Sequence, residues 1–132
     1  MRVEQMPDRF WSVLESHARN QDSLVSWLRR ASADEIVAYQ LAYEQAAEEI
    51  ADYWDGPVVD GVPYSEDDTE DLCKWVVAQG REAWVAACSD LGEAVRRYTA
   101  RDVNDAWTPG EPAYEIFFER FGASLHVRLA EA

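Results

Sequence analysis

The sequence predicts an all-α fold, a helical bundle of about five to seven helices. Apolar residues recur at spacings of three and four along most of the chain, which places them on one face of a helix. Serine followed three residues later by an acid, a helix start signal, precedes two of these patterned stretches. Glycine and proline cluster in the segment 55–64 and mark an irregular stretch at 101–112. These two segments therefore divide the predicted helices into three groups, one before, one between and one after them.

The composition is that of a soluble globular protein. A chain of 132 residues fits one domain, here 1–132, with a core large enough to fold alone. No run approaches the roughly 20 apolar residues of a membrane helix, and the first residues lack the apolar stretch of a signal peptide, so we expect a cytoplasmic protein. The formal net charge of −14 repels nucleic-acid phosphates and anionic membranes and attracts basic partners.

Two short helices are expected at the start of the chain. The first covers 6–17, with Pro7 and Asp8 in its first turn. The second lies around 24–28, with Asp22 or Ser23 as its cap. The apolar faces are formed by Met6, Phe10, Val13, Leu14 and His17 in the first helix and by Leu24, Trp27 and Leu28 in the second.

A long helix follows. Ser32 and Glu35 read S-x-x-E, a capping box in which each side chain accepts a hydrogen bond from a free backbone N–H group. The pattern continues to about Trp54. One face carries Ile36, Tyr39, Tyr43, Ala47, Ile50 and Trp54, and acids crowd the other faces.

The segment 55–64 cannot continue this helix because it holds two Gly and two Pro. We expect a loop with Val58 and Val59 directed into the core, and a short extended segment is compatible with it. Ser65 and Asp68 then start the next helix, a variant of the capping box. Its buried stripe is Leu72, Cys73, Val76 and Val77, with Trp75 at the edge.

Gly80 interrupts this helix, since glycine is the weakest helix former after proline. Residues 81–88 resume the pattern with Trp84 and Val85 as apolar anchors, and Asp90 caps a further helix. Its apolar residues are Leu91, Ala94, Val95 and Tyr98.

A last strong helix begins at Pro112 and ends before Gly122, which suits a C-terminal stop. Tyr114, Phe117, Phe118 and Phe121 share one face of it by spacing. The tail 123–132 is compatible with either a short helix or a strand.

An acidic cluster at 66–71 is the strongest candidate site. Five acids fill six positions, which is more than the capping and dipole of one helix start require. Tyrosine and tryptophan beside acids form a good contact surface for an Arg- or Lys-rich protein. The candidate partner-binding residues are Tyr53, Asp55, Tyr64, Glu66, Asp67, Asp68, Glu70 and Asp71.

The same carboxylates leave a second hypothesis open, an enzyme or a divalent-cation-binding protein, with Asp60 as a further ligand. The spacing from Asp55 does not match an EF-hand, and His17, His126, Cys73 and Cys88 do not approach zinc-ligand spacing. Motifs for phosphate binding or an activated nucleophile are missing from the sequence, so we assign no catalytic residue and no cofactor. The two cysteines are expected to be reduced thiols in helical surroundings.

The order of residues from 8 to about 90 resembles the DUF4240 family of bacterial proteins. The resemblance rests on Arg9-Phe10-Trp11, Ser32 to Ile36, Tyr53-Trp54-Asp55, Ser65 with Asp67-Asp68, Trp75, Gln79-Gly80-Arg81 and Asp90. The resemblance implies a small helical protein with a regulatory or interaction role and no known reaction. It leaves the function to be argued from the site.

Overall fold

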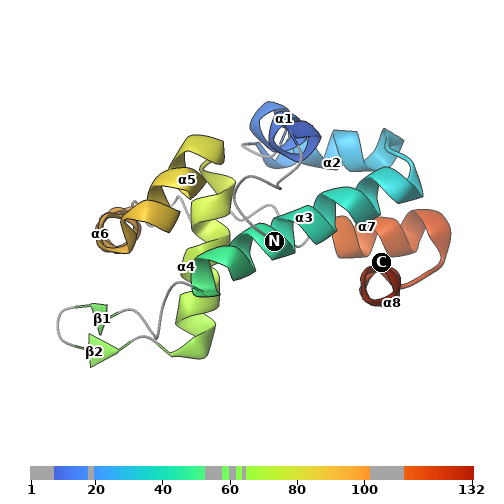
Figure 1. The fold of residues 1–132 in the computed structure, drawn as a ribbon. Coiled ribbons are helices and arrows are strands. Elements are labelled where there is room, and N and C mark those ends of the chain that lie inside the picture. The colour runs from blue at the N-terminus through green and yellow to red at the C-terminus, as the bar shows by residue number, and fades with distance from the viewer. Residues whose placement is uncertain (1–7, 18–19, 53–57, 60–61, 64, 102–111) are drawn as a thin grey trace.

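The all-α fold is confirmed. The structure, a computed structural model, describes residues 8–17, 20–52, 58–59, 62–63, 65–101 and 112–132. In these ranges it contains eight helices and one short β-hairpin (Figure 1). The predicted number of five to seven helices was therefore too small. The additional helix is the tail, which the sequence left ambiguous between a helix and a strand.

The helices follow the chain in the expected order. α1, α2 and α3 are Asp8–His17, Gln21–Arg30 and Ala33–Asp52, and the hairpin pairs β1 (Val58–Val59) with β2 (Val62–Pro63) in antiparallel register. α4, α5 and α6 are Glu66–Ala78, Arg81–Ser89 and Leu91–Thr99. α7 and α8 are Pro112–Phe121 and Leu125–Glu131. Within the described residues, none of these helices combines the length and the apolar composition needed to cross a lipid bilayer.

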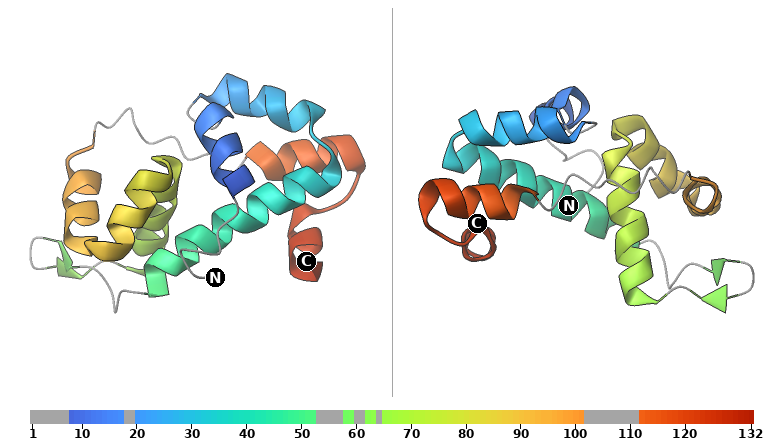
Figure 2. Two further views of the ribbon diagram at one scale, coloured as in Figure 1. Left: turned by 45° about the horizontal axis from the view of Figure 1, so that its top comes forward. Right: turned by 180° about the vertical axis from the view of Figure 1, so that it is seen from behind.

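The long helix α3 organises the molecule. Its first part packs against α1, α7 and α8, and α2 lies between α1 and α7. Its last part packs against α4 and α5, and α6 packs on both of these (Figures 1 and 2). Helices α4 to α6 thus form one end of the molecule, with the hairpin beside the start of α4.

The core runs along both sides of α3 and takes residues from all eight helices. The largest side chain with no exposed surface is Trp84 of α5, whose indole N–H donates a hydrogen bond to the Ala46 carbonyl at 2.9 Å. The predicted faces of α1 to α4 supply much of the rest, namely Phe10, Leu14, Leu24, Trp27, Leu28, Ile36, Tyr39, Tyr43, Ile50, Leu72, Val76 and Val77.

Three predicted apolar contacts are wrong. Val85 is 40% exposed, and Phe118 and Phe121 of α7 are 62% and 38% exposed. The buried face of α7 is instead Ala113, Ile116 and Phe117. The spacing of apolar residues identifies the apolar face of a helix. The packing of α2 and α3 against α7 decides which residues of that face are buried.

The helix start signals are confirmed with one correction. Ser32 Oγ accepts the Glu35 N–H at 3.1 Å, and Glu35 Oε1 accepts the Ser32 N–H at 3.3 Å. The cap of α2 is Asn20, whose side chain accepts the Ser23 N–H at 3.1 Å, and not Asp22 or Ser23. The helix begins earlier than its apolar pattern, so the capping residue lies further upstream.

The break at Gly80 is also confirmed. Gly80 has φ of 107°, in the region that side chains other than glycine rarely adopt. Gly122 ends α7 with φ of 65°, as expected for a helix C-terminal stop.

Removal of the α3 cap should weaken the fold measurably. We expect Ser32→Ala to lower the free energy of unfolding by about 1 kcal/mol, because an N–H group at the start of α3 loses its acceptor. Urea denaturation followed by circular dichroism measures this. Ser124→Ala is the matched control, since Ser124 caps α8 without a side-chain hydrogen bond. Equal losses in both variants would contradict the role of the Ser32 hydroxyl.

Candidate partner-binding site

The start of α4 positions the predicted acidic cluster on the surface. Ser65 Oγ accepts the Asp68 N–H at 3.1 Å, which fixes the first turn of the helix. Four of the predicted site residues with described side chains follow, and all four are exposed: Asp67, Asp68, Glu70 and Asp71. We call these four residues the α4 acidic cluster.

Most of this charge is not neutralised within the described part of the chain. Glu70 pairs with Lys74 at 3.0 Å, one turn further along α4. No described residue forms an ion pair with Asp67, Asp68 or Asp71. Three carboxylates of the cluster are therefore exposed and have no ion-pair partner among the residues that the structure describes.

Local structure accounts for only part of the cluster. Asp67 and Asp68 lie in the first turn, where the helix dipole favours an exposed acid by about 0.3–1 kcal/mol. Asp71 lies beyond that turn, and the Asp68 N–H already has its acceptor in Ser65. The third carboxylate is thus a surplus with no helix-start role.

The neighbouring part of α3 adds to the negative charge. α3 packs against α4 (Figure 1), and its last part carries Glu48, Glu49 and Asp52 and no Lys or Arg. Glu48 is exposed in the last part of the helix, where the dipole disfavours an acid. This half of the acidic surface was not among the predicted site residues, although the acids on the outer faces of α3 were visible in the sequence.

The other predicted site residues are not tested by the structure. Tyr53, Asp55 and Tyr64 lie outside the described residues, and so does Asp60 of the alternative cation site. Glu66 opens α4, but its side chain is not described. Trp75, which flanks the cluster in sequence, belongs to the core and contacts the Tyr98 ring edge-on at 5.5 Å.

Basic side chains of the described residues are mostly occupied. Arg9 pairs with Glu35, Arg29 with Glu119, Arg81 with Asp8, Arg96 and Arg97 with Glu93, and Arg128 with Asp34. Arg120 donates to two backbone carbonyls, and Arg101 donates to a third. Apart from Lys74, most of the basic side chains of the described residues therefore make their contacts away from the α4 acidic cluster.

Two of these contacts lower carboxylate pKa values. The Ser32 backbone N–H, followed by the Arg9 guanidinium, holds the pKa of Glu35 below its usual range. Hydrogen bonding from Arg96, assisted by Arg97, does the same for Glu93. Both carboxylates are thus charged at neutral pH and engaged with neighbouring groups.

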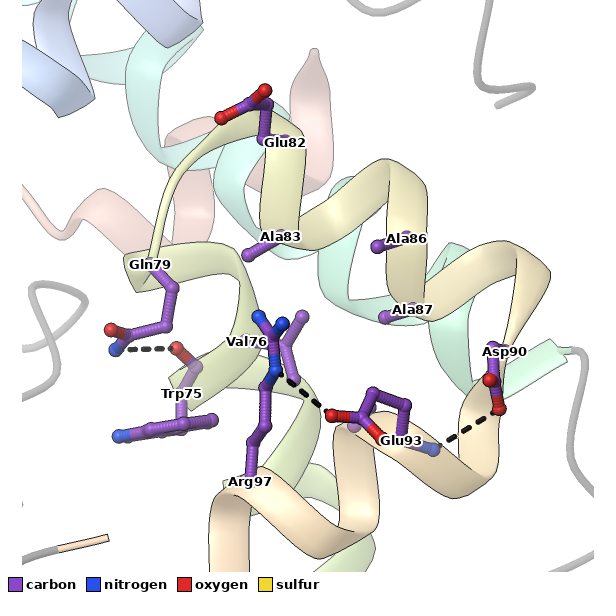
Figure 3. Close-up of a pocket in the computed structure, with 11 residues that line it drawn as sticks. Trp75, Val76, Gln79, Glu82, Ala83, Ala86, Ala87, Asp90, Glu93 and Arg97 are labelled. Carbon is purple, nitrogen blue, oxygen red and sulfur yellow. Dashed lines mark hydrogen bonds and ion pairs between the residues drawn. The ribbon is translucent and has the colours of Figure 1, made fainter.

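A second surface feature is a groove of about 480 Å³ between α4, α5 and α6 (Figure 3). Small residues form much of its lining, with Ala83, Ala86 and Ala87 from α5 and Ala94 from α6. Its polar residues are Gln79, Glu82, Asp90, Glu93 and Arg97. The volume is in the range of ligand-binding clefts. This groove was not predicted from the sequence, although the alanines at spacings of three and four between Glu82 and Asp90 are a pattern that could have indicated it.

Four described side chains of types used in catalysis, those of Cys73, Cys88, Tyr114 and His126, lie in structural surroundings. Burial raises the pKa of the free thiols of Cys73 and Cys88 to about 12 and about 11, so both are protonated and weakly nucleophilic at neutral pH. The Tyr114 hydroxyl donates to Glu44, and its ring stacks on His126 at 4.2 Å, which joins α7 to α3 and α8. Among the described residues, no group of three or more His, Cys, Asp or Glu side chains is placed to hold a metal ion.

Comparison with known proteins adds a family. The family model described as "Protein of unknown function (DUF4240)" matches residues 6–124 of the 132-residue chain. The match extends beyond the range of about 8–90 expected from sequence and includes the phenylalanine-rich helix α7. No curated protein matches the chain, and no solved structure matches it.

Proposed function

We propose that this chain, which belongs to the DUF4240 family of proteins of unknown function, is a non-enzymatic interaction protein that binds a basic partner protein. The contact surface is the α4 acidic cluster. In sequence it continues to Glu66, Asp55, Tyr53 and Tyr64. An immunity, antitoxin or regulatory adapter role would fit such a surface.

The observation that supports the proposal is the exposure of three carboxylates without an ion-pair partner among the described residues, Asp67, Asp68 and Asp71. Like charges gathered on one surface repel one another, and an isolated helix start does not need the third. A partner that supplies Arg or Lys removes this repulsion and gains charge-assisted hydrogen bonds. Binding of a partner's Arg or Lys side chains would therefore explain why the cluster holds more carboxylates than the start of α4 needs.

The net charge of the whole chain also supports a basic partner. A net charge of −14 steers a basic protein toward the surface over a distance of about one Debye length, roughly 8 Å at physiological salt. Such steering acts on the association rate and fades as salt rises. The proposed interaction is accordingly salt-sensitive.

The proposal can be tested with two variants of equal net charge. In the site variant, Asp67→Asn, Asp68→Asn and Asp71→Asn neutralise the cluster. In the matched variant, Asp22→Asn, Glu115→Gln and Glu131→Gln neutralise three other exposed acids, the first two of which also lie in first helical turns. Each variant and the wild type are used to capture proteins from the native host at about 50 mM and about 300 mM salt.

We expect the wild type and the matched variant to retain a basic protein at low salt and the site variant to lose it. With the purified partner, three surface contacts of about 0.5 kcal/mol each predict a Kd about tenfold weaker for the site variant. Equal loss in both variants would mean that net charge alone governs binding, which contradicts a defined site.

The same proteins address the alternative hypothesis. Calcium, magnesium, manganese and zinc are each titrated while the Tm is followed, since a ligand of the folded state raises the Tm. A rise specific to one cation that is lost in Asp67→Asn and Asp68→Asn would favour a cation-dependent protein over an interaction protein.

A further inference from the structure

The groove between α4, α5 and α6 has a lining that permits close approach of another helix. Ala83, Ala86 and Ala87 lie on one face of α5 and extend along it, and Ala86 is exposed (Figure 3). α5, which forms one wall of the groove, has nine residues and is about 13 Å long, or roughly two and a half helical turns. Helices pack at axis separations of 8–10 Å, and small residues at the contact allow the shorter values.

The charges of the groove are placed at its two ends. Glu82 lies at the start of α5, and Asp90 lies at its end (Figure 3). Glu82 is exposed and forms no ion pair with a described residue. Asp90 accepts the Glu93 N–H at 3.1 Å and likewise forms no ion pair with a described residue. The two acids are eight positions apart, about 12 Å along a helix.

The remaining charges in the groove are already paired. Glu93 accepts from Arg96 at 2.8 Å and from Arg97 at 3.3 Å. Figure 3 shows Arg97 extending from α6 toward Val76 of α4. A cation brought to the middle of the groove would meet this guanidinium, whereas cations at the two ends would meet Glu82 and Asp90, which form no ion pair with a described residue.

We propose that the groove binds a helix of the partner protein with small apolar residues on its contact face and Lys or Arg at positions i and i+7. Residues seven apart lie on the same face of a helix and about 10 Å apart along it. Their long side chains then reach Glu82 and Asp90, while the face between them packs on the alanines of α5. This is helix-in-groove recognition with charge complementarity at both ends.

The inference rests on the proposed function for the kind of partner, a basic protein. It adds a binding surface and a recognition pattern. Asp71 and Asp68 lie on the same face of α4 as the groove residues, at four and seven residues from Trp75 and at eight and eleven residues from Gln79. The α4 acidic cluster would therefore attract the partner, and the groove would select the helix.

The probe is a synthetic, fluorescently labelled, alanine-based helical peptide with blocked ends and Lys at i and i+7. The control peptide has the same composition with Lys at i and i+5, which lie on roughly opposite faces. Fluorescence anisotropy gives the Kd for the full chain. We expect the i, i+7 peptide to bind at least about tenfold more tightly than the control.

A charge exchange then tests the contact directly. Glu82→Lys should weaken the i, i+7 peptide about tenfold, and a peptide with Glu in place of the Lys that faces position 82 should recover binding to within about threefold of the original pair. Glu115→Lys is the matched control, because Glu115 is an exposed first-turn acid of α7 outside the groove. Ala86→Phe fills the groove and should also weaken binding about tenfold.

Equal affinity of the two peptides, no binding below about 1 mM, or no recovery in the charge exchange would each overturn the groove as the binding surface. Those results leave the proposed function standing if the native partner still depends on Asp67, Asp68 and Asp71. Conversely, the groove could discriminate between the two peptides while no basic protein is captured through the α4 acidic cluster. That result would contradict the proposed function and leave the groove as a binding surface.

Discussion

Trp84→Ala is expected to lower the free energy of unfolding by about 3–5 kcal/mol, a large part of the 5–15 kcal/mol typical of a small protein. Trp84 has no exposed surface, and its ring lies 5.3 Å from that of Trp11. Its indole also donates the hydrogen bond to Ala46 of α3. One side chain thus joins α5 to both α1 and α3, and its removal leaves a cavity that these helices cannot close.

Two control variants separate the causes. Trp84→Phe keeps most of the ring volume and loses the hydrogen bond, so it should cost about 1–2 kcal/mol beyond the smaller packing loss. Val85→Ala changes the next residue of α5, which is 40% exposed, and should stay within about 0.5 kcal/mol. Urea denaturation measures all three. A Trp84→Ala loss no larger than that of Val85→Ala would contradict the packing of α5 against α3.

Arg120→Met is expected to have the second-largest effect, a loss of about 2 kcal/mol. The Arg120 guanidinium of α7 donates from Nη1 to the carbonyls of Leu28 and Ala31, at 2.5 Å and 2.6 Å. These carbonyls lie at the end of α2, where the last C=O groups of a helix have no N–H donor within the helix. Hydrogen bonds from a charged donor contribute about 1.5–3 kcal/mol, and methionine keeps the length of the side chain while it removes the donor.

The appropriate comparison is Arg29→Met. Arg29 lies in the last turn of α2 and forms a surface ion pair with Glu119 of α7 at 3.6 Å. An exposed pair of this kind contributes at most about 1 kcal/mol. Hydrogen exchange should accelerate in the last turn of α2 in Arg120→Met and change little in Arg29→Met. Similar behaviour of both variants would show that charge near α2, and not the two carbonyl contacts, is what matters.

The acidic cluster illustrates how far the sequence predicted the candidate site. The capping role of Ser65 and the exposure of Asp67 and Asp68 follow from local spacing, and the structure agrees with both. The surplus of acids over what a helix start needs was also visible in the sequence, and its role as a binding site stays a prediction. The contribution of α3 and the groove could not be read in the same way. Both depend on which faces of α3, α4, α5 and α6 lie next to each other.

The sequence by itself determined seven of the eight described helices, most of their boundaries and the family. Capping by Ser32 and Ser65 and the break at Gly80 act within one turn of the backbone, so the residues that decide them are neighbours in the chain. Only the tertiary structure decided that Phe117 is buried while Phe118 is exposed, and that Arg120 closes the end of α2. Those outcomes depend on contacts between helices far apart in sequence, where the arrangement of whole elements selects the buried edge of each apolar stripe.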